Sequence, residues 1–443
     1  MERLTFIARE GIMAEAVIVG GVRTPFVKAG AAFNQLPAQE LGRLAVRELL
    51  DRANLDPARV DELICGNVAS PVDAANVARV IALRAGIPRD KIAHTVSRNC
   101  ASGFECVTQA CDRVVSGRAK CVVAVGVDSM SHIPLFYPKK FADKLQRLSS
   151  ARSAWQKLKT FASFRLSDLT PQIGIKLGLT DPVTGLMMGD TAEKLAREFK
   201  IMRDEQDRFA LRSHQLAAAA WQENRLASEV MTVYVDDRDG GVKPISQDVG
   251  FRADQSQEAL AKMKPYFDRR WGSVTIGNSC QITDGAAALL IVEANTAREF
   301  GLTPLGRIRD YAYAGCDPAR MGLGPVFATS RVLQQTGLKL SDMQLIELNE
   351  AFAAQAIACL RRFESPAGAS AAEGCDFESL GSIYLDRVNV NGGAIALGHP
   401  VGATGTRLIL TLLHELRRRN LSRGLATLCI GGGQGGAVVV ETT

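Results

Sequence analysis

The chain has 443 residues, of which 47% are hydrophobic and 23% charged, with a formal net charge of +6. That length allows two or three domains with large cores, and no apolar run reaches the roughly 18 residues of a membrane-spanning helix. The ten cysteines form no C-x-x-C pair, and the five histidines form no H-E-x-x-H motif. This pattern argues against a disulfide framework and against a metal site, and favours a reduced, cytoplasmic protein. Residues 1–12 do not resemble a signal peptide; a disordered extension and a misassigned start both fit them.

The first part of the chain alternates predicted strands and helices. Short apolar runs closed by glycine predict strands over 16–21, 62–66 and 121–126, and amphipathic stretches predict helices over 40–53 and 75–85. The run at 121–126 is apolar on both faces, which is typical of a central strand covered by helices on both sides. The order is that of an α/β protein.

A cysteine stands at the end of a polar turn in this part of the chain. Apolar residues follow Cys100 at spacings of three and four and predict a helix that ends near Gly117. A position at or just before a helix N-terminus favours a thiolate over a thiol, and a thiolate is a nucleophile. The alternative is a small buried hydrophobic residue, which describes most free cysteines. This stretch alone leaves both interpretations open.

The regular alternation is lost between residues 134 and 268, which we interpret as an inserted loop domain. Within it, 139–165 holds eight basic residues and one acidic residue, with apolar residues at helical spacing. A basic amphipathic helix suits an anionic membrane surface or an acidic partner, and the alternative is a solvated helix packed on its own domain. The excess of basic residues is confined to this helix, and no motif that recognises nucleic acid accompanies it. No nucleic-acid partner is therefore expected. A further helical region is predicted over 190–224, with a capping signal at Asp190.

Strand and helix patterns resume in the last third of the chain. The predicted strands are 286–292, 345–348, 387–390, 426–430 and 437–440, with a helix over 402–419. Both ends of the chain therefore present a strand, a polar turn, a helix and an apolar strand. This order predicts a duplicated α/β architecture, although residue-level repetition is weak.

Three polar turns in this part contain candidate chemical groups. Asn349 follows a strand and is suited to orienting a water or to capping a helix. His399 lies among the glycines of 391–405 and suits general base work near neutral pH. Cys429 ends a strand before the glycines of 431–436. No P-loop or dinucleotide fingerprint occurs, so nucleotide binding is discounted, and ligand sites in α/β sheets favour such strand ends.

Four motifs together resemble the thiolases, the acyl-CoA:acetyl-CoA C-acyltransferases. They are Asn-Cys-Ala-Ser-Gly at 99–103, Asn-Glu-Ala-Phe at 349–352, Gly-His-Pro at 398–400 and Cys-Ile-Gly-Gly-Gly at 429–433. The resemblance implies the duplicated thiolase fold, with two similar α/β halves and mixed sheets between helices. The halves would be 14–295, including the inserted loop domain at about 134–268, and 296–443.

The resemblance also implies roles for five residues. Cys100 would be the acylated nucleophile, His399 the base that activates it, and Cys429 the group that exchanges a proton with the α-carbon of acetyl-CoA. Asn349 would hold a water that forms an oxyanion hole with His399. The backbone N–H groups of Cys100 and Gly431 would form a second one. Coenzyme A would be a substrate, and no cofactor or metal is expected.

Further positions match the family's binding sites for coenzyme A and the acyl chain. Arg252 would contact the adenine end of coenzyme A, while Met188, Phe267 and Phe352 would line the pantetheine and acyl pocket. Cys280 stands where serine or threonine is common, which puts a hydroxyl contact to pantetheine in doubt.

Two departures bear on the acyl chain that the enzyme would take. Met187 replaces a histidine frequent in acetoacetyl-CoA thiolases, and the insertion looks like that of thiolase subunits of β-oxidation complexes. However, those subunits often have histidine where this chain has Asn349. We therefore predict degradative thiolysis of 3-oxoacyl-CoA with a broad or longer chain range. The alternatives are Claisen condensation to acetoacetyl-CoA and, from another class, a non-catalytic scaffold that binds coenzyme A or lipid.

The expected partners follow from the same resemblance. They are acyl-CoA and coenzyme A as substrates and further copies of the chain in a homodimer or homotetramer. Through residues 139–165, a multifunctional β-oxidation subunit or a membrane surface would be a further partner.

Overall fold

The computed structural model describes residues 14–237, 239–365 and 379–443. Residues 1–12 and Cys375, which enter the sequence analysis, lie outside the described residues.

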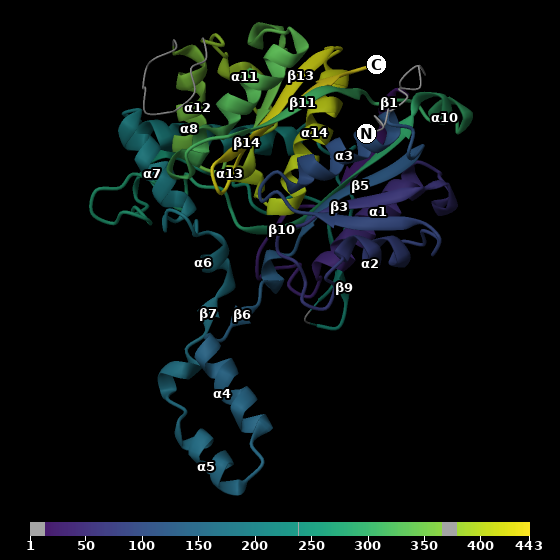
Figure 1. Cartoon of the computed structure of the whole chain (residues 1–443). Helices are drawn as coiled ribbons and strands as arrows, with labels where there is room; N and C mark the ends of the chain where they lie inside the picture. The colour runs from purple at the N-terminus through teal and green to yellow at the C-terminus, as the bar shows by residue number, and fades with distance from the viewer. Residues whose placement is uncertain (1–13, 238, 366–378) are drawn as a thin grey trace, which may run out of the picture.

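Two mixed β-sheets form the framework of the molecule (Figure 1). The first has the order β1 (Ala16–Arg23), β10 (Thr283–Glu293), β5 (Cys121–Asp128), β3 (Glu62–Gly66) and β4 (Ile92–Val96), with β2 (Val27–Lys28) also on β10. The second has the order β11 (Arg307–Gly315), β14 (Gln434–Glu441), β13 (Arg423–Ile430) and β12 (Leu345–Leu348).

The two sheets share one pairing pattern. In the first, β1, β10 and β5 pair antiparallel, and β3 pairs parallel with β5. In the second, β11, β14 and β13 pair antiparallel, and β12 pairs parallel with β13. Corresponding outer strands even share a register shift, between Ile18 and Gly20 in β1 and between Ile308 and Asp310 in β11. The predicted duplicated α/β fold with mixed sheets is confirmed.

Helices α3 (Ser102–Val115) and α14 (Val401–Arg418) lie between the two sheets. Both helices share one hydrophobic core with Val122 of the first sheet and Leu428 of the second. Side chains alternate along β5, so the neighbouring Val123 faces the opposite side, in a separate core.

Other helices cover the outer faces of the sheets. Helices α1 (Ala38–Arg52) and α2 (Val77–Arg84) cover the first sheet, and α11 (Gly324–Thr336) and α12 (Ala353–Glu364) cover the second. The body therefore has five layers, helix–sheet–helix–sheet–helix (Figure 1).

The two central helices touch through glycine. A methyl group on Gly103 would lie 2.6 Å from the nitrogen of Thr406 and 2.9 Å from that of Gly405, which is closer than packed atoms approach. The Thr406 hydroxyl donates a hydrogen bond to the Gly103 carbonyl at 3.0 Å. The first turns of α3 and α14 therefore lie backbone against backbone, which brings together the segments that precede them.

Residues 134–178 leave the body as a separate projection, called the arm below (Figure 1). Its elements are β6 (Leu135–Phe136), α4 (Lys139–Ser150), α5 (Ala154–Ala162), β7 (Gln172–Ile173) and α6 (Gly174–Gly178). The single basic helix expected over 139–165 is thus wrong. The chain turns at Ala151, which has extended backbone, and Ser153 then caps α5 with Gln156 in a capping box.

The helical region predicted over 190–224 also consists of two helices. They are α7 (Met188–Glu198) and α8 (Arg203–Gln222), separated where Lys200 adopts a left-handed conformation with φ of 52°. Helix α7 begins two residues before Asp190, whose side chain accepts a hydrogen bond from the backbone of Met187. Both helices pack on the second half of the chain, against α12 and its neighbours (Figure 1).

The strand predicted over 387–390 is wrong. Val388 makes one isolated bridge to Ile346, and Asn389 has φ of 48°, outside the strand region. The Asn389 side chain accepts from the Leu348 N–H and donates to the Leu348 carbonyl, both at 2.8 Å. The amide therefore occupies the edge of β12 where a neighbouring strand would pair.

The remaining elements are short. They are β8 (Val233–Asp236), β9 (Val242–Ile245), α9 (Gln257–Ala261), α10 (Ala294–Glu299) and α13 (Ala394–Leu397). Across the described ranges, none of the helices combines the length and apolar character needed to cross a membrane.

The glycine contact predicts the effect of a single added methyl group. Gly405→Ala should lower the free energy of unfolding by about 1–3 kcal/mol, because the new Cβ must push α3 away from α14. Gly178→Ala is the matched control, since no atom lies within 4 Å of a methyl group there. Chemical denaturation followed by circular dichroism measures both, and equal stability of the two variants would contradict the close contact.

Candidate active site

Cys100 lies in a tight turn between β4 and α3. Asn99 has φ of 46°, a left-handed conformation that asparagine tolerates. The Ser102 hydroxyl accepts from the Arg98 N–H and donates to the Asn99 carbonyl, both at 2.8 Å. The Asn99 side-chain amide donates to the Gly431 carbonyl at 2.8 Å. The turn before α3 is therefore fixed against the glycine turn that follows β13.

The surroundings of Cys100 keep its sulfur protonated. Burial raises the pKa of the Cys100 thiol, the N–H groups of Gly431 and Cys100 itself oppose this effect, and Asp128 adds to it. The expectation that the helix N-terminus favours a thiolate is therefore corrected, because desolvation outweighs the backbone N–H groups. The thiol needs a base to become a nucleophile.

His399 supplies a neutral imidazole. It precedes α14, is 7% exposed, and its Nδ1 lies 2.6 Å from the Thr404 hydroxyl oxygen. That hydroxyl donates to the Pro400 carbonyl at 3.0 Å, so it accepts from Nδ1–H, which leaves the lone pair on Nε2. Burial lowers the pKa of His399 to about 4, and the positive charge of Arg407 contributes. Nε2 is buried with no hydrogen-bond partner in the described chain.

Asn349 has an orphaned side chain. Its N–H donates to the Thr427 carbonyl on β13 at 2.9 Å, and the residue is fully buried. Neither atom of its side-chain amide has a partner within the described residues. The capping role is wrong, because α12 begins at Ala353 after Phe352. Buried unpaired polar atoms cost about 1–3 kcal/mol each, so a polar group from outside the protein is the natural partner of this amide and of His399 Nε2.

Glu350 joins the two loops that hold Asn349 and His399. Its carboxylate accepts from the Ser213 hydroxyl at 2.6 Å, from the Asn389 amide at 2.8 Å and from the Ile395 N–H at 3.3 Å. Burial raises its pKa. A methyl group on Gly393 would collide with this carboxylate, which explains a glycine there.

Cys429 faces an apolar wall. It is the next-to-last residue of β13, is 1% exposed, and packs in one cluster with Met188, Phe267 and Phe352. The rings of Phe267 and Phe352 meet edge to face with centroids 5.9 Å apart. The Met188 sulfur lies 3.3 Å from the position of a Cβ on Gly431, so this wall adjoins the glycine turn. Burial raises the pKa of Cys429 well above its ordinary value.

Cys280 and its neighbours connect the turns. The Cys280 N–H donates to the Ala351 carbonyl at 3.0 Å, and the next carbonyl, of Gln281, accepts from the His399 N–H at 3.0 Å. Burial raises the pKa of the Cys280 thiol to about 12, so it stays protonated. The segment that holds Cys280 therefore lies between the turn of Asn349 and the turn of His399.

Arg252 stands apart from the other predicted residues. Its side chain is exposed, and its backbone N–H donates to His214 Nδ1 at 3.2 Å. It lies two residues beyond Gly250, whose carbonyl accepts from the Gln281 side chain at 2.8 Å. The guanidinium thus lies at the margin of the site, on the solvent side.

Sequence reasoning missed the residues that orient these groups. They are Asn99, Gln281, Glu350 and Thr404, each of which holds a turn through the hydrogen bonds given above. Only Asn99 left a local signal, because asparagine favours the left-handed conformation. Gln281 and Glu350 act across the fold, so their partners cannot be read from neighbouring residues, whereas Thr404 bonds His399 and Pro400 a few residues earlier in the chain.

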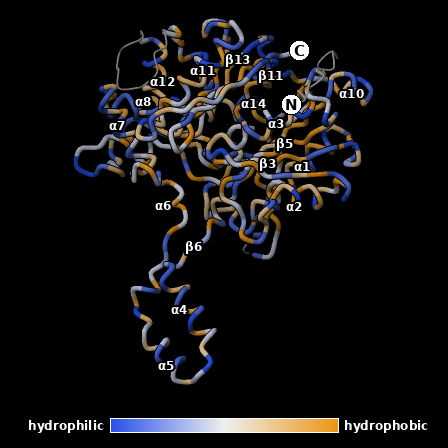
Figure 2. Tube along the Cα trace, in the orientation of Figure 1, coloured by the Kyte–Doolittle hydropathy of each residue, from blue (hydrophilic) through white to orange (hydrophobic). Residues whose placement is uncertain are grey.

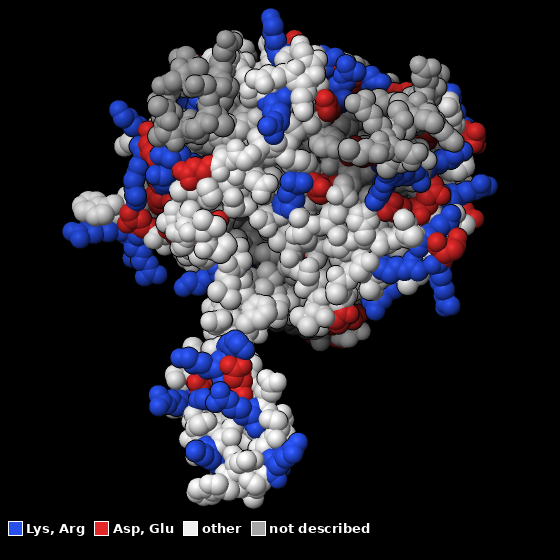
Figure 3. Space-filling view, viewed as in Figure 1, with Lys and Arg blue, Asp and Glu red and all other residues white. Residues whose placement is uncertain are grey.

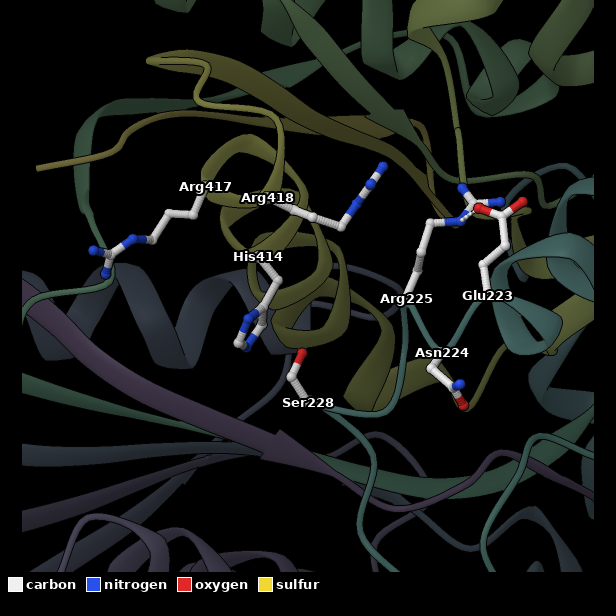
Figure 4. A pocket seen from close by; sticks show the side chains of 7 residues that line it. All are labelled: Glu223, Asn224, Arg225, Ser228, His414, Arg417 and Arg418. Carbon is white, nitrogen blue, oxygen red and sulfur yellow. Dashed lines mark ion pairs between the residues drawn. The ribbon is translucent and has the colours of Figure 1, made fainter.

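A separate surface cavity of about 480 Å³ lies between α14 and the segment after α8 (Figure 4). Its lining residues are Glu223, Asn224, Arg225, Ser228, His414, Arg417 and Arg418. Its arginines already have protein partners: Glu223 for Arg225, the Pro304 carbonyl for Arg417 and Glu415 for Arg418. None of the predicted catalytic residues lines it, so the candidate active site lies elsewhere. The part of the chain that the structure describes also holds no cluster of three or more potential metal ligands.

Comparison with known proteins identifies the family. The family models "Thiolase, N-terminal domain" and "Thiolase, C-terminal domain" match residues 16–295 and 302–442. This chain belongs to the thiolase family. A 3-ketoacyl-CoA thiolase of Serratia proteamaculans is 42% identical over 439 residues, 99% of each chain.

Two solved thiolase structures resemble the whole fold. Human mitochondrial 3-ketoacyl-CoA thiolase superposes with a TM-score of 0.83 at 35% identity, over 98% of this chain and 100% of that one. The acetyl-CoA acetyltransferase of Bacillus anthracis superposes with a TM-score of 0.85 at 34% identity, over 97% of this chain and 99% of that one. The overall shape is thus common to thiolases named for different reactions.

Removing the Thr404 hydroxyl tests whether it fixes the tautomer of the His399 imidazole. Thr404→Val should lower kcat on the order of 10- to 100-fold with little change in KM, because Nδ1 loses the acceptor that keeps Nε2 unprotonated. Thr404→Ser retains the hydroxyl and should keep most of the activity. Steady-state kinetics on both variants measure this, and a valine variant within twofold of the parent would contradict the role of Thr404.

Proposed function

We propose that this thiolase cleaves 3-oxoacyl-CoA with coenzyme A through an acyl-enzyme on Cys100, giving acetyl-CoA and a shortened acyl-CoA. The observation that supports this most directly is a buried, protonated thiol just before α3 and a neutral imidazole just before α14, two helices whose first turns are in backbone contact. Relatives named 3-ketoacyl-CoA thiolase match along the full length of the chain. The alternatives, a condensing enzyme and a non-catalytic scaffold, gain no support from these relatives.

In the first half-reaction His399 Nε2 takes the Cys100 proton, and the sulfur attacks the 3-keto carbon. The C2–C3 bond then breaks, the acyl group stays on Cys100, and Cys429 protonates the departing acetyl-CoA enolate. Asn349, through a water shared with His399, would stabilise one oxyanion. The N–H groups of Cys100 and Gly431, which lie against the sulfur, would stabilise the other. One such donor is worth about 2.7–4 kcal/mol.

In the second half-reaction the thiol of a new coenzyme A attacks the Cys100 thioester. The Cys429 thiolate left by the first half-reaction takes the proton of this thiol. The C–S bond to Cys100 then breaks, acyl-CoA leaves, and the His399 imidazolium returns its proton to the Cys100 sulfur. Two acyl transfers through one cysteine predict ping-pong kinetics. No step needs a metal or a redox cofactor, and coenzyme A is a substrate.

The apolar wall supports the binding roles of the remaining residues. Met188, Phe267 and Phe352 would contact pantetheine and the acyl chain, Cys280 would border the pantetheine, and Arg252 would meet the adenine end of coenzyme A. The exposed side chain of Arg252 suits a charged, solvated nucleotide. Met187, half-buried and next to Met188 in the chain, is apolar, which favours longer acyl chains.

We also propose the domain division, assembly and location of the protein. The halves are 14–295, with the loop domain at 134–268, and 296–443. A homodimer or homotetramer is supported by the edge of the first sheet, where β4 has no outer neighbour among the described residues and Ile92 is 61% exposed. Among the described residues, no disulfide involves Cys65, Cys100, Cys106, Cys111, Cys121, Cys280, Cys359 or Cys429, which supports a cytoplasmic location.

The arm has the character of a docking element. Neither α4 nor α5 has a buried residue, and Trp155, Leu158 and Phe161 on one face of α5 are 59–72% exposed. Lysine and arginine are spread over the arm with few acidic residues among them (Figure 3), and hydrophilic and hydrophobic residues are mixed along its trace (Figure 2). Lys144 on α4 donates to the Ser163 carbonyl at the end of α5 and to the Asp168 carboxylate beyond it, both at 2.6 Å, which holds the two helices together.

We propose that the arm docks on an anionic lipid surface. Aromatic and leucine side chains flanked by lysine and arginine suit the boundary between headgroups and acyl chains. A multifunctional β-oxidation subunit is the alternative occupant, and the test below separates the two.

Cys100→Ser should abolish thiolysis while the circular dichroism spectrum stays unchanged, because a serine hydroxyl is a far weaker nucleophile at neutral pH. Mass spectrometry of the parent after brief exposure to acyl-CoA of four to sixteen carbons should show acylation of Cys100. Acylation at another cysteine would contradict the assigned nucleophile. Turnover confined to acetoacetyl-CoA would contradict the longer chain range.

For the arm, Trp155→Ser/Leu158→Ser/Phe161→Ser should weaken binding to phosphatidylglycerol-containing vesicles about tenfold or more in co-sedimentation, because the apolar face is lost. Thiolysis of short substrates should be unchanged. Val183→Ser/Tyr234→Ser/Val242→Ser, three exposed apolar residues outside the arm, is the matched control. If the parent does not bind vesicles but co-purifies with a β-oxidation subunit through the arm, the lipid proposal is wrong and the arm binds that subunit.

A further inference from the structure

A buried ion pair joins the helix behind His399 to the strand before Asn349. Arg407 on α14 donates through Nη1 to the Glu347 carboxylate on β12 at 2.6 Å. The two side chains are 1% and 4% exposed. Glu347 lies two residues before Asn349, and α14 begins two residues after His399. The pair therefore connects the two elements whose ends hold the candidate base and the candidate oxyanion amide.

Stability alone does not account for this pair. The Nε and Nη2 atoms of Arg407 are buried without a hydrogen-bond partner in the described chain, so the guanidinium is only partly satisfied. Buried ion pairs are often no better for stability than apolar side chains of the same volume, because desolvation offsets their attraction. A tie that fixes geometry near the site is the more direct explanation.

The charges around the pair act on the site in a definite direction. Arg407 is the charged neighbour that, after burial itself, lowers the pKa of His399. Burial raises the pKa of Glu347 to about 7, Arg407 opposes this, and the carboxylates of Glu229 and Glu350 add to it. Glu229 is itself held by Arg23 at 2.7 Å and by the Thr411 hydroxyl at 3.1 Å. Arg407 is thus the cation that faces both Glu347 and the imidazole.

We propose that Arg407 and Glu347 are positioning residues for thiolysis. The ion pair sets α14 against β12 so that His399 Nε2 and the Asn349 amide meet the same polar atom of the reacting complex. The charge of Arg407 also adds to the effect of burial, which keeps the imidazole unprotonated. Neither side chain touches substrate in this scheme. The inference rests on the proposed roles of His399 and Asn349.

The test replaces the pair as a unit. Arg407→Met/Glu347→Leu fills the same volume without leaving a lone buried charge and should keep the fold. It should lower kcat about 10- to 100-fold, as small displacements of catalytic groups do, with KM for coenzyme A within about threefold. The acid limb of kcat/KM should move to higher pH, because His399 loses the cation that lowers its pKa. A folded double variant with unchanged kcat and pH profile would overturn the proposal.

Two further variants keep the test decisive. Glu347→Gln preserves shape and removes only one charge, so it should lower kcat even if the double variant fails to fold. Arg407→Lys retains the cation and should restore the parent pH profile with an intermediate kcat. An unchanged kcat in Glu347→Gln, or a pH profile in Arg407→Lys that matches the double variant, would contradict the inference.

The control pair is Arg423–Glu441, at the end of β13 opposite Cys429. Arg423→Met/Glu441→Leu should leave kcat and its pH profile unchanged. Acylation of Cys100 in the parent, read by mass spectrometry, tests the proposed function independently. If kcat and its pH profile are unchanged in Arg407→Met/Glu347→Leu while Cys100 of the parent is acylated, the positioning role is rejected and the proposed function stands.

Discussion

The site depends on the backbone contact between α3 and α14. Gly103 and Gly405 let the first turns of these helices meet without side chains between them. The two helices occupy corresponding places in the duplicated halves: α3 precedes β5 in the first sheet, and α14 precedes β13 in the second. Cys100 and His399 stand just before these helices, so the duplication itself brings a thiol and an imidazole together from opposite halves.

Burial then decides the protonation states. The Cys100 thiol has a raised pKa and the His399 imidazole a lowered one, so both groups rest neutral and no ion pair has to be desolvated. In the proposed mechanism the proton moves when the substrate presents its carbonyl to the N–H groups of Cys100 and Gly431. Orphaned polar atoms on Asn349 and His399 fit such a preorganised site, where donors wait for charge that develops during the reaction.

The sequence predicts the α/β elements and the family well, because apolar periodicity and the four motifs are local signals. It fails where partners are distant. Apolar and polar residues alternate over 387–390, which predicts a strand, yet the Asn389 side chain forms the hydrogen bonds to β12 that a strand there would make. Cys100 reads as a helix-terminal thiolate, yet desolvation from the surrounding fold reverses the direction of its pKa shift. Gln281 and Glu350 act only through residues that the chain places near them after folding.

The most direct test of this account is the pH dependence of Cys100 alkylation by iodoacetamide, followed by peptide mass spectrometry in the parent and in His399→Ala. We expect the parent rate to be almost constant from about pH 6 to 8, because the neutral imidazole assists the thiol throughout that range. In His399→Ala the rate should be lower and should climb with pH toward the raised pKa of the thiol. Identical pH profiles in the two proteins would contradict activation of Cys100 by His399.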